Sequence, residues 1–198
     1  MLRTLSVVFA LLLSGCGAVS GPGQIDDDVT LLLGARPSAV HAGVYLAVER
    51  GFDEAEGVDL TVRRRGDAIA LLRARRVQAA ILDRPLTGTV CVMAITQQPR
   101  PGHFVCVLRT TLEDQRATVK ALVATLQRGY TEANADPESA VQAELSAAPG
   151  LDGTRLAAAL DRISPSFAAG VPAIGYLRAG LRPAVRFDRT LVGPVSRD

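Results

Sequence analysis

The sequence predicts an α/β fold in which a parallel-rich sheet is flanked by helices and followed by a helical C-terminal third. Two observations carry this prediction. Short apolar runs alternate with segments of helical periodicity over residues 29–82, and helical periodicity then dominates residues 111–163. Hydrophobic residues make up 48% of the chain and aromatic residues only 4%, so the core must be built from Ala, Val and Leu.

The first half of the chain has clear boundaries between its elements. Gly34 ends the first apolar run, Ser38 suits the N-cap of the helix that follows, and Gly51 stops that helix. Strand, helix and strand in this order favour right-handed parallel units. The predicted elements are a strand over 29–33, a helix over 39–50, a strand over 58–62, a helix over 66–76 and a strand over 77–82.

Two further apolar runs, Val90–Ile95 and Phe104–Leu108, predict strands on either side of a turn-rich segment. The pattern leaves two arrangements open, an antiparallel pair or two crossings between lobes. Cys91 and Cys106 lie one in each run, so they form either a disulfide or two buried neighbours.

In the second half of the chain, residues typical of helix N-termini mark where the helices are expected to begin. Thr111 and Asp114 fit a capping box, and Asp136 followed by Pro137 is a cap with proline at the first helical position. The predicted helices run from 111 to about 130, from 137 to about 147, and from 152 or 154 to 163, with a possible last strand over 185–187.

The N-terminus predicts export and lipidation. Arg3 precedes an apolar run over 5–13 that is too short to span a bilayer, and Leu-Ser-Gly precedes Cys16. This box resembles that of bacterial lipoproteins, in which the cysteine is diacylated and becomes the first mature residue. An ordinary secretory signal with a bystander cysteine is the alternative. The predicted parts are a signal peptide over 1–15, a flexible tether over 16–28 and a folded domain over 29–198.

The net charge argues against a nucleic-acid-binding protein, and the small number of potential metal ligands argues against a metalloprotein. The formal net charge is only +2, and the arginine clusters at 63–65 and 73–76 have no interleaved aromatic residues. They are therefore expected to form a solvated face, without nucleic acid as a partner. With only two histidines and no clustered ligands, we expect neither a metal site nor a cofactor.

Several segments resemble one known family. VHAGVYLAVERGF at 40–52, followed by EGVDL at 56–60, resembles the opening of substrate-binding proteins of the nitrate, sulfonate and thiamine-pyrimidine-precursor type. Residues 111–130, ADPE at 135–138 and PGLD at 149–152 resemble the far end of that family. The resemblance implies a type II periplasmic-binding-protein fold that delivers a small nitrogen- or sulfur-containing solute to an ABC-type permease.

One departure from the family is large. A whole second lobe would lie between segments like 92–99 and 103–108, but here only Arg100-Pro101-Gly102 separate them. The chain is therefore expected to be a truncated, single-lobed version that binds weakly or not at all, because a cleft needs two walls to exclude water.

Candidate ligand-binding residues follow from the rule that open α/β sheets bind ligands beyond the carboxyl ends of their strands. The rule selects Arg36, Ser38, His41, Asp67 and Asp83. No catalytic or metal-binding residue is predicted.

Each candidate also has a structural interpretation. His41 either bonds to a heterocyclic solute or faces solvent in a first helical turn. Asp83 either holds an amino group of the solute or caps a loop or pairs with Arg84. Tyr130 either stacks on a ring or belongs to the core.

Three classes of function compete at this stage. The favoured one is the solute-binding lipoprotein of an importer, anchored to the outer face of the cell membrane. The alternative is a membrane-anchored interaction or structural protein that no longer binds a solute. An enzyme is not expected, because the cysteine-rich metal motif of enzymatic relatives and any nucleophile–base pair are missing from the sequence.

Overall fold

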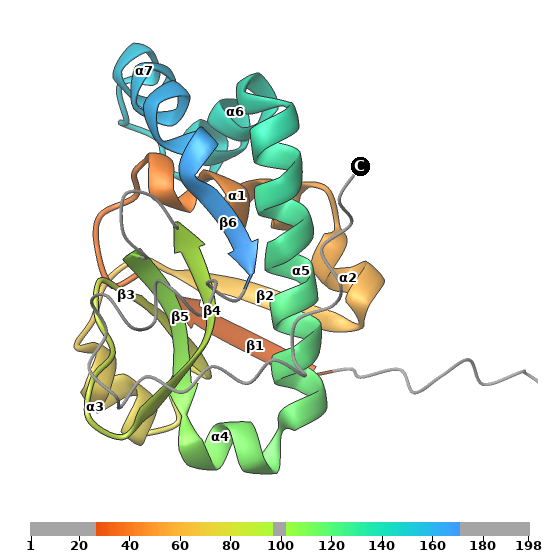
Figure 1. Ribbon diagram of the computed structural model, residues 1–198, viewed down its shortest axis with the longest axis vertical. Coiled ribbons are helices and arrows are strands. Elements are labelled where there is room, and N and C mark those ends of the chain that lie inside the picture. The colour runs from red at the N-terminus through yellow and green to blue at the C-terminus, as the bar shows by residue number, and fades with distance from the viewer. Residues whose placement is uncertain (1–26, 97–101, 171–198) are drawn as a thin grey trace, which may run out of the picture.

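The computed structural model describes residues 27–96 and 102–170, which form a six-stranded sheet with helices on both faces (Figure 1). The strand order is β2-β1-β3-β5-β4-β6. The strands are β1 (Asp27–Leu32), β2 (Val58–Arg63), β3 (Ala79–Leu82), β4 (Thr89–Thr96), β5 (Gly102–Leu108) and β6 (Phe167–Gly170).

Seven helices and two 3₁₀ turns connect and cover these strands within the described residues. They are η1 (Ala39–His41), α1 (Ala42–Glu49), α2 (Phe52–Glu56), α3 (Ala68–Arg73), α4 (Arg109–Asp114), α5 (Arg116–Ala135), α6 (Pro137–Ala147), α7 (Gly153–Ile163) and η2 (Ser164–Ser166).

The first three strands pair in parallel, as the alternation of strands and helices predicted. β1 pairs with β2 on one side and with β3 on the other, both in parallel. The remaining pairs, β3 with β5, β5 with β4, and β4 with β6, are antiparallel. The α/β class is therefore confirmed, with a mixed sheet in which the parallel half contains the elements predicted for residues 29–82.

Alternate side chains at the end of β1 and at Leu33, the residue after it, enter the cores on opposite faces of the sheet. Leu31 and Leu33 pack into the main core with α1 and α5, whereas Leu32 packs with Leu72 of α3 in a smaller core. Because successive strand residues point to opposite faces, an apolar strand without polar alternation must be covered on both. The helices on the two faces provide that cover.

Helices α1 and α5 cross at very short range. A β-carbon at Gly129 would collide with the carbonyl oxygen of Gly43, and one at Gly43 would collide with the Tyr130 ring. Tyr130 is fully buried and its hydroxyl donates to the Val40 carbonyl oxygen at 2.7 Å. The core interpretation of Tyr130 is therefore the correct one.

Several predicted boundaries were wrong. The segment predicted as a helix over 39–50 is helical over residues 39–49, with the 3₁₀ turn η1 as its first turn, so these bounds are nearly right. The helix predicted over 66–76 is shorter, since α3 covers only Ala68–Arg73. The helix predicted from Thr111 begins earlier, at Arg109, and is interrupted at Gln115, so Thr111 is no N-cap. The caps at Asp136 and Asp152 are confirmed, since each side chain accepts a backbone N–H of the first turn.

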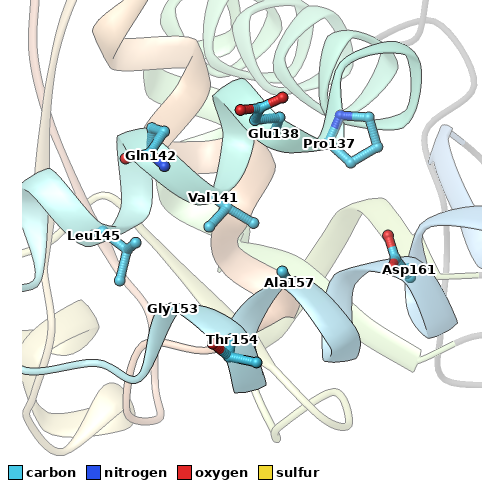
Figure 2. A pocket seen from close by; sticks show the side chains of 9 residues that line it. All are labelled: Pro137, Glu138, Val141, Gln142, Leu145, Gly153, Thr154, Ala157 and Asp161. Atoms are coloured by element: carbon cyan, nitrogen blue, oxygen red, sulfur yellow. The ribbon is translucent and has the colours of Figure 1, made fainter.

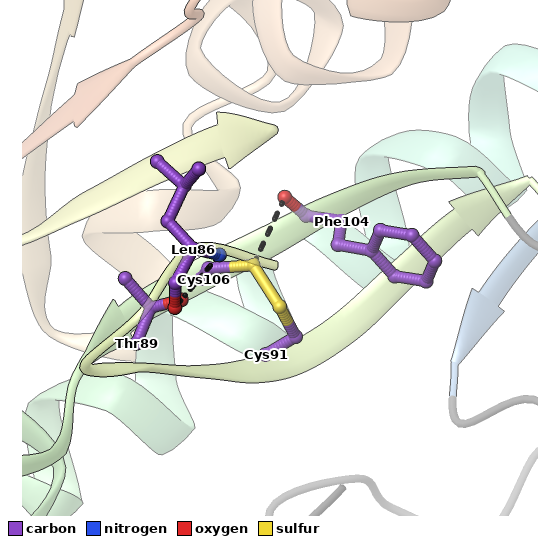
Figure 3. The surroundings of a disulfide bond; sticks show 5 residues. All are labelled: Leu86, Thr89, Cys91, Phe104 and Cys106. Carbon is purple, nitrogen blue, oxygen red and sulfur yellow. Dashed lines mark hydrogen bonds between the residues drawn. A yellow bond between two sulfur atoms is a disulfide. The ribbon is translucent and has the colours of Figure 1, made fainter. Parts of the chain in front are cut away.

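Strands β4 and β5 form an antiparallel pair, which settles one of the open alternatives. Cys91 and Cys106 lie opposite each other in this pair and are joined by a disulfide (Figure 3). Short strand β6 was not predicted and adds to the free edge of β4. The possible strand over 185–187, the signal peptide, Cys16 and most of the tether lie outside the described residues.

Within the described ranges, 27–96 and 102–170, no helix combines the length and the apolar character needed to cross a bilayer.

Candidate functional site

A hollow of about 230 Å³ lies at the carboxyl edge of β1 and β3. It is the place where sequence reasoning expected a ligand, since loops after parallel strands meet there. The lining residues are Leu33, Gly34, Ala35, Ser38, His41, Ile81, Leu82, Asp83, Arg84, Leu86 and His103.

Gly34 allows β1 to turn directly against the end of β3. Its φ is +71°, and a β-carbon at this position would collide with the Ile81 carbonyl oxygen. Only glycine combines this conformation with so close an approach. The turn returns the chain at Ser38, from which η1 and α1 start over the sheet edge.

The backbone at Ser38 fixes the orientation and tautomer of His41. The Ser38 N–H donates to His41 Nδ1 at 3.2 Å, and the Ser38 hydroxyl oxygen lies 3.3 Å from the same nitrogen. Because Nδ1 accepts an N–H, the proton of the neutral ring is on Nε2. Nε2 is buried and has no hydrogen-bond partner among the described residues.

His41 is neutral at pH 7. Burial lowers its pKa to about 4, and the neighbouring His103 adds to this effect, while backbone groups of Leu33 and Ser38 and the Asp83 carboxylate oppose it. The side chain is only 1% exposed, so the solvent-facing interpretation is wrong. A buried N–H donor without an acceptor is costly, and its place in the lining makes it available to a ligand.

His103 is a polar lining residue that sequence reasoning missed. Its Nε2 lies 3.3 Å from Asp83 Oδ1, and its buried Nδ1 has no partner in the described part of the chain. When Nε2 donates to Asp83, Nδ1 of the neutral ring is an acceptor. His103 also has φ +51°, a left-handed conformation that is uncommon outside glycine and frequent at ligand sites.

Asp83 thus pairs with His103 and not with Arg84. Its side chain is 87% exposed, so this contact contributes little to stability and leaves the carboxylate open to a ligand.

The strand and loop on the far side of the hollow are well braced. The disulfide ties β5, which carries His103, to β4 (Figure 3). Thr89 Oγ1 donates to the Leu86 carbonyl oxygen at 2.8 Å and accepts the Leu86 N–H at 3.1 Å, which closes the loop after β3. His103 therefore belongs to a strand that is covalently tied to its neighbour, and Leu86 belongs to a loop that is closed by hydrogen bonds.

The five predicted residues fall into two groups. Ser38, His41 and Asp83 lie together in the lining. Arg36 is exposed in the turn after β1, one residue beyond the lining residue Ala35, and Asp67 caps α3 by accepting the Ala70 N–H at 3.0 Å. Neither Arg36 nor Asp67 lines the hollow.

A larger groove of about 600 Å³ lies between α6 and α7 (Figure 2). Apolar groups such as Val141, Leu145 and Ala157 form its floor, and Glu138 and Asp161 lie at its exposed rim. The groove lacks the converging buried polar groups by which small-molecule sites fix a ligand's orientation. The hollow at the strand ends is therefore the better candidate despite its smaller size.

Among the described residues, no three His, Cys, Asp or Glu side chains lie close enough together to hold a metal ion.

Comparison with known proteins gives the fold its context. No protein-family model matches the chain, and no curated protein matches it. The Candida albicans CA3427 gene product, which defines a family with the generic periplasmic binding protein fold, is similar with a TM-score of 0.55 and 9% identity. That alignment covers 71% of this chain and 80% of the other. This chain has a periplasmic-binding-protein-like fold.

A protein from Bordetella bronchiseptica RB50 is similar with a TM-score of 0.58 and 11% identity, over 84% of this chain and 92% of that chain. Identities this low show the fold alone. Membership of the nitrate, sulfonate and thiamine-pyrimidine-precursor family stays a prediction, as does the loss of a second lobe.

Proposed function

We propose that this protein is an extracytoplasmic solute-binding lipoprotein of an ABC-type importer, without enzymatic activity, and that its solute binds in the hollow at the strand ends. The observation that carries the proposal is His41 Nε2–H, a buried donor without a partner, in the lining of that hollow. The periplasmic-binding-protein-like fold supports it.

The polar groups of the hollow favour a heterocyclic solute. His41 Nε2 offers a donor, His103 Nδ1 offers an acceptor, and Asp83 offers a carboxylate. An aminopyrimidine presents a ring nitrogen that accepts and an amino group that donates. A thiamine pyrimidine precursor, the class implied by the sequence resemblance, therefore complements these groups.

Localisation rests on the leader. A diacylated Cys16 would hold the domain at the outer face of the cell membrane through the tether over 16–28, where the permease lies.

A second function is favoured by the size of the hollow. At about 230 Å³ it is smaller than most ligand sites, and only five residues, 97–101, connect β4 to β5. The alternative is a non-binding, membrane-anchored interaction protein derived from the same family.

Calorimetry on the chain from Gly17 onward separates the two functions. With hydroxymethylpyrimidine, formylaminopyrimidine, taurine and nitrate as probes, we expect one of the pyrimidines to bind. Because one wall leaves much of the ligand in water, we expect an affinity in roughly the millimolar to high-micromolar range.

Variants of the lining provide the control. His103→Ala should weaken binding by roughly five- to tenfold, the loss of about one hydrogen bond. Asp67→Asn keeps the α3 cap and lies outside the lining, so it should bind as the unchanged protein does. Absence of binding to all four probes would favour the interaction protein. Submicromolar binding to a monomer, lost in His41→Ala and Asp83→Ala, would show that a complete site survives.

A further inference from the structure

Exposed arginines follow the carboxyl ends of the parallel strands, along the same edge of the sheet at which the hollow opens. Arg63 is level with Leu32 at the end of β1, and Arg64 and Arg65 follow directly. Arg36 lies in the turn after β1, and Arg84 follows β3 and lines the hollow. We call Arg36, Arg63, Arg64, Arg65 and Arg84 the arginine rim.

No residue of the rim forms an ion pair within the part of the chain that the structure describes. This differs from arginines elsewhere in the domain, four of which contact a carboxylate. The pairs are Arg50 with Asp136, Arg75 with Asp114, Arg128 with Glu56, and Arg155 with Asp152.

The carboxylates of this edge do not neutralise the rim. Asp67 caps α3, and Asp83 contacts His103. Within the rim, Arg63 Nε donates to the Arg65 carbonyl oxygen at 3.2 Å. This edge therefore carries five arginines and two carboxylates, and the excess of positive charge creates a positive field along the edge at which the hollow opens. Such a field attracts anions and concentrates them at the opening.

The positions of Arg36 and Arg84 connect this field with the hollow. Arg84 is part of the lining, and Arg36 follows the lining residue Ala35. Deeper in the hollow lie the unpartnered ring nitrogens of His41 and His103. Buried ring nitrogens therefore lie inside the hollow, and exposed arginines lie at its opening.

We propose, resting on the proposed function, that the solute carries an anionic group such as a phosphate monoester, which lies at the mouth against Arg36 and Arg84 while the uncharged part contacts His41 and His103. Guanidinium groups bind phosphate oxygens in a bidentate way, which suits this role. Arg63, Arg64 and Arg65, further along the edge, would steer the anion to the opening.

The test compares two probes that differ only in the anionic group, hydroxymethylpyrimidine and its phosphate monoester, by calorimetry at low ionic strength on the chain from Gly17 onward. We expect the phosphate ester to bind about tenfold tighter, a difference of about 1.4 kcal/mol. In Arg36→Gln/Arg84→Gln this preference should fall below about threefold, because the charge-assisted hydrogen bonds are lost. Arg73→Gln, an exposed arginine at the end of α3, is the matched control and should keep the preference.

Each outcome bears on the proposal in a distinct way. Equal affinity for the two probes would refute the proposal that the solute carries an anionic group, and so would a preference for the phosphate ester that persists in the double variant. Either result would leave the proposal of solute binding intact. Failure of both probes to bind removes solute binding and the anionic group together. Inorganic phosphate alone, and vesicles containing phosphatidylglycerol, test other sources of phosphate. If inorganic phosphate or the vesicles bind as tightly as the ester, and His103→Ala does not weaken that binding, the arginine rim binds anions in general and the proposal is wrong.

Discussion

Glu144 allows a quantitative test of the structure, because it is a buried carboxyl group without a hydrogen-bond partner. The side chain has no exposed surface, and both oxygens are unpartnered among the described residues. Tyr130 does not donate to Glu144, because its hydroxyl donates to the Val40 carbonyl oxygen. The hydroxyl of nearby Tyr45 also makes no hydrogen bond among the described residues. Burial raises the pKa of Glu144 to about 8.

This shift sets the direction of the pH effect. Between the unfolded value of 4.5 and the folded value of about 8, the unfolded chain has lost the proton while the folded chain keeps it. The free energy of unfolding therefore falls as pH rises through this window, by about 1.4 kcal/mol per pH unit. From pH 4.5 to pH 7 the loss is on the order of 3 kcal/mol.

Glu144→Gln removes the titration and keeps the shape of the side chain. The variant should match the unchanged protein near pH 5 and exceed it near pH 8 by about 3 kcal/mol, or roughly 6–12 °C in Tm. Urea unfolding at pH 5, 6, 7 and 8 measures the difference, and Glu138→Gln, an exposed carboxylate of the same helix, is the control. Stability curves of Glu144→Gln and the unchanged protein that run parallel from pH 5 to pH 8 would refute the reasoning.

Three other predictions concern separate parts of the chain. In the Glu144→Gln background, the free energy of unfolding should rise by about 3 kcal/mol from pH 4 to pH 6.5 and then level off. The reason is that folding lowers the pKa of buried His41 from 6.5 to about 4. A free energy of unfolding that stays constant between pH 4 and pH 6.5 would contradict this. Gly43→Ala should lower the free energy of unfolding by about 2 kcal/mol or more in chemical denaturation, since the new methyl group has no room beside the Tyr130 ring. Gly88→Ala is the comparison: Gly88 is exposed and its new methyl group meets no neighbour, so this variant measures only the effect of placing alanine at a positive φ. Cys16→Ser should abolish acylation and membrane retention, as judged by mass spectrometry of membrane fractions; retention of both would remove the basis for the localisation.

Local signals predicted the parallel half of the fold well. Short apolar runs gave β1, β2 and β3, with a glycine next to the first two, and the caps at Asp136 and Asp152 gave the starts of α6 and α7. These elements depend on contacts within a few residues, which a single sequence displays.

Elements that depend on distant contacts were missed. β6 has the sequence Phe-Ala-Ala-Gly, which has little strand preference, and it exists because β4 offers a free edge. α2 spans five residues between Gly51 and Gly57, both at positive φ, and is too short to show periodicity. No local pattern marks either element.

The sequence predicted only part of the candidate site, because the position of His103 also depends on contacts between distant segments. The rule on carboxyl ends of parallel strands selected Ser38, His41 and Asp83, but it does not consider antiparallel strands. Since β5 runs against β3, with Phe104 opposite Leu82, its beginning reaches the same edge and brings His103 to the hollow. Finding His103 required the direction of β5, which the sequence left open.

The disulfide between β4 and β5 also changes what a broken backbone would mean for this protein. Every peptide bond between Cys91 and Cys106 lies inside a covalent ring, so hydrolysis of any one of them leaves a single molecule. The two pieces would each keep strands of the same sheet, since β3 and β6 lie on either side of the linked pair. A nicked chain would therefore migrate as two fragments only after reduction, and intact mass on a non-reducing gel is no proof of an intact backbone.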